Sequence, residues 1–64
     1  EGVEVARKVE ELPEGYRVIL SLYLFEDYTH QEIADELGIS VSTSKSQYHR
    51  GKQKLKELLT IQMQ

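Results

Sequence analysis

The sequence predicts an all-α domain of four helices that ends in a helix-turn-helix, in the winged-helix-like or homeodomain-like class but without a wing. Two observations support this fold class. Apolar residues recur at helical spacing along the chain, and the sustained alternation of a strand is missing. Residues 29–50 then carry a helix cap, a glycine break and a second cap in the order that a helix-turn-helix requires. A chain of 64 residues is the size of one domain.

The first half of the chain predicts two helices that meet at Pro13. The first covers about 3–11, and the second covers about 13–25, because proline suits the first position of a helix. The second helix is apolar on two sides, which places it at the centre of the bundle. Its two apolar stripes consist of Tyr16, Ile19, Leu20 and Tyr23, and of Val18, Leu22 and Phe25. Asp27, just beyond this helix, is expected to take a left-handed conformation.

The third helix is expected over 30–37, the first helix of the motif. Thr29 and Glu32 have the spacing of a capping box, in which each side chain bonds the other residue's backbone amide. Gly38 supplies the positive φ that often ends a helix. We expect His30 to be exposed in the first turn. The residues expected to face the core are Ile33, Ala34 and Leu37.

The fourth helix is expected to begin after Ser40 as N-cap and to continue to about Leu59, with residues 60–64 frayed. Its inward positions are spaced by three and four residues: Ser44, Tyr48, Gly51, Leu55 and Leu58. We expect the Ser44 hydroxyl to bond a carbonyl one turn back. Gly51 costs helix propensity, and we expect it to let the second helix pack closely.

The outer side of the fourth helix predicts a surface for the major groove of DNA. Short polar side chains and bases can pair with base edges there, and no acid follows until Glu57. Lys52, Lys54 and Lys56 lie farther along, where they suit contacts with phosphates. The candidate DNA-binding residues are Ser42, Thr43, Lys45, Ser46, His49, Arg50, Gln53 and Lys54. Gln47, near the core boundary, can equally have a structural role.

The charge distribution agrees with this surface although the net charge is −3. Residues 1–37 hold ten acids and three bases, whereas residues 38–64 hold five bases and one acid. This asymmetry favours a nucleic-acid face on the second half. The alternative is that the acidic half only keeps a small domain in solution.

Several other classes are disfavoured by composition. There is no cysteine, and the two histidines lack companion ligands, so we expect no metal site and no cofactor. The sequence contains neither a nucleophile–base set nor a phosphate-binding loop, so it gives no indication of an enzyme. No membrane span or signal peptide is evident, which predicts a cytoplasmic domain. The missing initiator methionine suggests a piece of a longer protein.

An ordered set of short motifs, spanning nearly the whole chain, resembles region 4 of bacterial extracytoplasmic-function (ECF) sigma factors. Each motif is weak alone, and their order and spacing carry the resemblance. They are Leu12-Pro13 followed by Arg17, Leu22-Tyr23-Leu24-Phe25-Glu26, Tyr28-Thr29, Glu32-Ile33-Ala34, Leu37-Gly38-Ile39-Ser40, Thr43-Ser44-Lys45-Ser46, His49-Arg50 and Lys54-Leu55.

The resemblance implies that residues 1–64 form one helix-turn-helix domain, a fragment of a longer sigma factor, that binds the promoter −35 element through its last helix. It also implies contact with the β flap of RNA polymerase and capture by an anti-sigma factor. The residues implied to face double-stranded promoter DNA are Thr43, Lys45, Ser46, His49 and Arg50. The sequence departs from the family pattern at Ser44, Gln47 and Gly51, where Val, Arg and Ala are usual.

Two alternative functions remain open at this stage. The DNA-binding domain of a LuxR-type response regulator also has four helices and a similar central motif, but Leu12-Pro13 and His49-Arg50 favour the sigma factor. A helix-turn-helix can also serve as a protein–protein interaction module. In that case the acidic half would be the surface that binds the partner protein.

Overall fold

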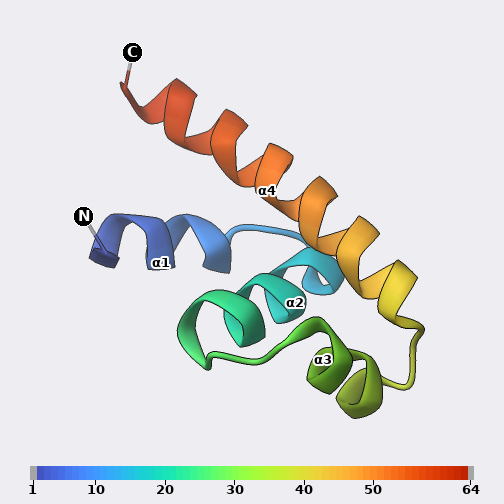
Figure 1. Ribbon diagram of the computed structural model, residues 1–64. Helices are drawn as coiled ribbons and strands as arrows, with labels where there is room; N and C mark the ends of the chain where they lie inside the picture. Colours follow the sequence, from blue (N-terminus) through green and yellow to red (C-terminus); the bar gives the residue numbers. More distant parts are fainter. Residues whose placement is uncertain (1, 64) are drawn as a thin grey trace.

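The computed structural model describes residues 2–63, with side chains placed for residues 3–60, and all of its regular elements are helices (Figure 1). They are α1 (Gly2–Glu10), α2 (Glu14–Phe25), α3 (His30–Leu37) and α4 (Val41–Met63). Within these residues no strand occurs, and no helix has the length and apolarity required to cross a membrane. The predicted all-α fold is therefore confirmed.

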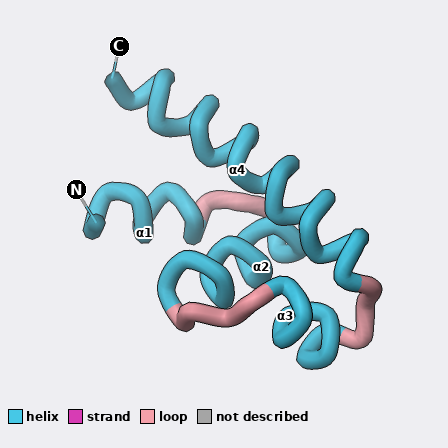
Figure 2. The backbone as a smooth tube through the Cα atoms, in the orientation of Figure 1, coloured by secondary structure: helices cyan, strands magenta, loops and turns pink. Residues whose placement is uncertain are grey.

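The helices are joined by three short loops, and α4 runs along the whole molecule (Figure 2). α1 lies beside the C-terminal part of α4, and α3 packs near the beginning of α4. Both α2 and α4 contact each of the other helices. The sequence predicts α2 at the centre of the bundle, and in the structure α2 and α4 occupy the centre together.

The core lies where α1, α2 and α4 meet. Val9, Leu12, Leu20 and Leu55 form its buried centre, and Tyr16 and Tyr48 pack against it. Ile33 and Ala34 are buried on α3 as predicted. Burial of these apolar side chains is the main stabilising contribution in a domain of this size.

The predicted boundaries of the first three helices are confirmed to within one residue. Pro13 has φ −55° and ψ 150° and precedes the first turn of α2. Asp27 has φ 61°, the left-handed conformation expected there. The capping box of α3 is complete: Glu32 N–H donates to Thr29 Oγ1 over 3.1 Å, and Thr29 N–H donates to Glu32 Oε1 over 2.8 Å. Gly38 ends α3 at φ 68° and ψ 36°.

Three expectations about exposure and length were wrong. Leu37 is 39% exposed, because it is the last residue of a short helix and only Ile33 and Ala34 of α3 reach the interior. Phe25 is 47% exposed, because it is the last residue of α2 and lies beside the exposed turn at 26–27. α4 continues to Met63, because no glycine or proline follows Leu59 to end it. Gln64, at the end of the segment expected to fray, lies outside the described residues.

Candidate nucleic-acid interface

The surface predicted to bind DNA begins at the N-terminus of α4, which Ser40 caps. Ser40 Oγ accepts from Thr43 N–H over 3.0 Å, and the Ser40 hydroxyl donates to Thr43 Oγ1 over 2.9 Å. Ser40 also accepts a backbone bond from Ser44 N–H. The cap satisfies amides that would otherwise lack partners at the start of the helix. It fixes the first turn of α4, from which the candidate residues project.

The structure places all the candidate residues on one helix and leaves each of them exposed. The short polar ones alternate with bases along the outer side of α4. The exposed residues are Ser42, Thr43, Lys45, Ser46, His49, Arg50, Gln53 and Lys54. Gln47 is half-buried at the edge of this surface, as expected.

The bases of α4 follow two flanks of the helix. Lys45, His49, Lys52 and Lys56 repeat at steps of three or four residues, so they follow one flank. Arg50 and Lys54, four residues apart, follow the other. A helix seated in the major groove has a phosphate backbone on each side, so bases on both flanks suit that position.

Among residues 3–60, the bases of this surface are not neutralised by the acidic half. Among the described residues, the ion pair found is Lys8 with Glu11 on α1 and the turn that follows it, at 3.4 Å. None of the α4 bases has a carboxylate within ion-pair distance in that part of the chain. Their charges therefore remain available to a polyanion.

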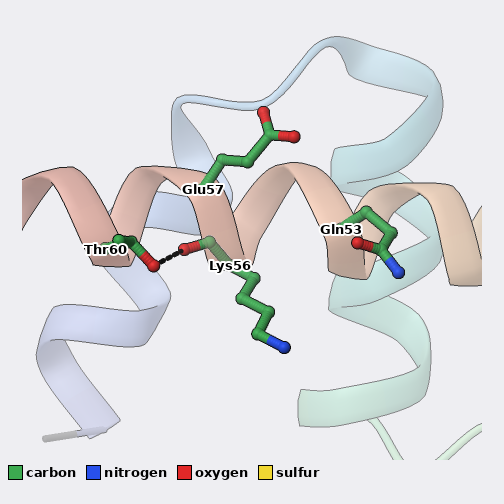
Figure 3. Close-up of a pocket in the computed structure, with 4 residues that line it drawn as sticks. All are labelled: Gln53, Lys56, Glu57 and Thr60. Carbon is green, nitrogen blue, oxygen red and sulfur yellow. Dashed lines mark hydrogen bonds between the residues drawn. The ribbon is translucent and has the colours of Figure 1, made fainter.

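Farther along α4 the outer surface is hollowed at two adjoining places. His49, Lys52, Gln53 and Lys56 line one hollow, which contains no acid. The neighbouring hollow shares Gln53 and Lys56 and is also lined by Glu57 and Thr60. Figure 3 shows Lys56 and Glu57 extending in opposite directions from the helix. Thr60 Oγ1 donates to the Lys56 carbonyl over 2.8 Å, so its hydroxyl is used within α4. The acid-free surface ends at Glu57.

The inner side of α4 contradicts two predictions made from sequence. Ser44 is fully buried, but its hydroxyl does not bond the carbonyl one turn back. Instead Ser44 Oγ lies 2.9 Å from His30 Nδ1 on α3. His30 is accordingly half-buried rather than exposed. The sequence gives no local signal for this pair, since its members are fourteen residues apart.

An aromatic cluster surrounds this pair. The His30 ring stacks on Tyr23 with centroids 4.7 Å apart and meets Tyr48 edge-on at 5.4 Å. Lys52 Nζ lies 5.4 Å from the centre of the Tyr48 ring. Burial, with a smaller contribution from Tyr23, raises the pKa of the Tyr48 phenol.

Gly51 marks a close approach between α2 and α4. A Cβ atom at this position would lie 3.2 Å from Tyr16 Cβ and 3.3 Å from Leu20 Cγ. The predicted role of Gly51 in close packing is confirmed. No group of acidic, histidine or cysteine side chains able to hold a metal ion is found in the described part of the chain.

The comparison with protein families decides the identity of this domain. The family model described as Sigma-70, region 4, matches residues 2–55, which is most of the chain. The chain belongs to the sigma-70 region 4 family. This match favours the sigma factor over the response-regulator alternative.

Relatives of this region 4 domain include ECF sigma factors. It is 45% identical to the RNA polymerase sigma factor SigZ of Bacillus subtilis over 51 residues, which cover 80% of this chain and 29% of SigZ. It is 31% identical to the ECF RNA polymerase sigma factor SigE of Mycolicibacterium smegmatis, over 91% of this chain and 23% of SigE. For the ECF RNA polymerase sigma factor SigW of Bacillus subtilis the identity is 33%, over 86% of this chain and 29% of SigW.

The chain is thus a region 4 domain of the ECF type, and it spans less than a third of the length of these relatives. No solved structure matches it.

Proposed function

We propose that this region 4 domain recognises the promoter −35 element, as part of an ECF sigma factor that directs transcription initiation. The supporting observation is the exposed surface of α4, which is acid-free from residue 41 to residue 56 and has bases on both flanks. Membership of the sigma-70 region 4 family supports promoter DNA as the ligand. The exposed surface of α4 is the place where this double-stranded DNA would bind.

The proposed roles follow from side-chain chemistry. Lys45 and Arg50 anchor the helix in the major groove, while Ser46 and His49 contact base edges. Lys54 contacts one phosphate backbone, and Lys52 and Lys56, which the sequence also predicts to suit phosphates, contact the other. The remaining members of the proposed interface are Ser42, Thr43 and Gln53. The isolated domain should bind weakly and lose affinity steeply with salt, because only about four or five phosphates are neutralised.

The acidic half of the domain is proposed to meet protein partners. Leu24 and Phe25 are exposed at the end of α2, next to Glu26 and Asp27. An apolar patch rimmed by charge suits a protein interface, here with the β flap of core RNA polymerase and, in the inactive state, with an anti-sigma factor. Residues 1–64 would act as one binding domain of a longer cytoplasmic protein, with no catalytic or cofactor-dependent role.

Footprinting of full-length protein with core polymerase on candidate promoters tests the proposal. Arg50→Ala should weaken protection of the −35 element by about tenfold, the expected cost of losing one charged contact that anchors the helix. Arg7→Ala is the matched control, because Arg7 is an exposed arginine on α1. Unchanged upstream protection in Arg50→Ala would remove the role given to Arg50. If no version of the protein protects a promoter, the protein-interaction alternative is favoured instead.

A further inference from the structure

His30 and Ser44 join the two helices of the helix-turn-helix. His30 is the first residue of α3, and Ser44 lies in the first turns of α4. Their side chains meet at 2.9 Å between Nδ1 and Oγ. Within the described residues, this is the only side-chain hydrogen bond that connects two different helices; the others lie within one helix or between a helix and its adjoining turn.

The hydrogen bond is held by aromatic packing from three helices. Tyr23 comes from α2, His30 from α3 and Tyr48 from α4, and each of the three rings contacts the other two. The interplanar angle of 23° between Tyr23 and His30 makes that pair stacked, which restricts the His30 ring. The Nδ1 atom is therefore presented to Ser44 in a defined position.

The contact affects α4 because Ser44 is buried on the inner side of that helix. Its side chain is fully buried, and a buried hydroxyl is costly unless it has a partner. Its neighbours Thr43 and Lys45 belong to the proposed DNA surface. Whether Ser44 donates to Nδ1 or accepts from it, the bond holds the side of α4 that carries Ser44 against the first residue of α3. In the proposed complex, the rotation of α4 about its axis decides which side chains point into the groove.

We propose that His30 is a positioning residue for DNA recognition, which acts through its hydrogen bond to Ser44 to set the orientation of α4. The inference rests on the proposed recognition of the −35 element. It gives His30 a role distinct from that of the exposed α4 residues, because His30 need not touch DNA. It also explains Ser44, one of the departures from the usual family pattern, as half of a pair.

The test compares promoter affinity of full-length variants assembled with core polymerase, on an intact promoter and on one with a scrambled −35 element. His30→Phe keeps a ring for the aromatic cluster but leaves Ser44 without a partner. Ser44→Ala removes the hydroxyl with a small residue that favours helix and so preserves folding. Gln31→Ala is the control, since Gln31 is exposed on α3 and bonds Asp35 of the same helix.

We expect each of His30→Phe and Ser44→Ala to lower the affinity for the intact promoter by about tenfold, with little change on the scrambled one. The double variant should lose no more than the larger single loss, because both changes remove the same interaction. Circular dichroism monitors helical content. If the His30→Phe variant has less helix than the wild type, the promoter affinity of Ser44→Ala alone tests the inference.

Two results would overturn the inference while leaving the proposed function intact. In one, Ser44→Ala binds the intact promoter as tightly as Gln31→Ala does. In the other, the losses of the two single variants add in the double variant. A wild-type protein that does not distinguish the intact from the scrambled promoter would instead overturn the proposed function, and this inference with it.

Discussion

Single residues in this domain are constrained mainly by contacts with other helices, as at Gly51 of α4, where a Cβ atom would lie 3.2 Å from Tyr16 Cβ of α2. Gly51 could be predicted from the sequence, because a glycine on the inner side of a long helix indicates close packing. His30 and Ser44 could not, because a polar pair fourteen residues apart depends on how α3 crosses α4. The exposure of Leu37 has the same origin: helical spacing gives the inward side of α3 but not how far the neighbouring helices extend.

The close approach at Gly51 gives a prediction about stability. Gly15→Ala should stabilise the domain by about 0.5–1 kcal/mol, because its Cβ would meet nothing within 4 Å. Gly51→Ala should gain less or lose stability, because its Cβ would lie 3.2 Å from Tyr16 Cβ, close to the α2 backbone. Urea unfolding of both variants measures the difference. Equal gains at the two positions would contradict the close approach.

At the scale of helices, local signals predicted most boundaries correctly. The capping box at Thr29, the left-handed Asp27 and Gly38, and the Ser40 cap were all confirmed. Each of these depends on a few neighbouring residues, which is why the sequence was sufficient. The end of α4 was misplaced because a helix that lacks a terminating residue gives no local signal where it stops.

The capping box predicts the cost of disturbing α3. Thr29→Ala removes the acceptor of the Glu32 amide and should lower the free energy of unfolding by about 1 kcal/mol. Ser46→Ala is a suitable control, because Ser46 is exposed within α4 and caps no helix. Urea unfolding at fixed pH and salt compares the two variants with the wild type. A Thr29→Ala variant as stable as Ser46→Ala would show that the cap contributes nothing.

At the scale of the whole molecule, charge is divided between the two halves of the chain. Of the eleven acids, ten lie within residues 1–37 and only Glu57 lies on α4, whereas the five bases beyond residue 44 all lie on α4. A negative net charge is thus compatible with DNA binding, because the proposed DNA surface is confined to α4. The sequence predicted this division and the outer side of α4, since both follow from residue order and helical repeat. The arrangement of the helices that supports α4 required the structure.

Position-specific crosslinking tests the central claim, that the outer surface of α4 meets the −35 element. A photoreactive residue is placed at Ser46 of the full-length protein, and a second version carries it at Glu11, on the acidic half. Each is assembled with core polymerase on promoter DNA, irradiated and mapped. The account predicts crosslinks from position 46 within the −35 element and none there from position 11. Crosslinks to that element from position 11, with none from position 46, would contradict it.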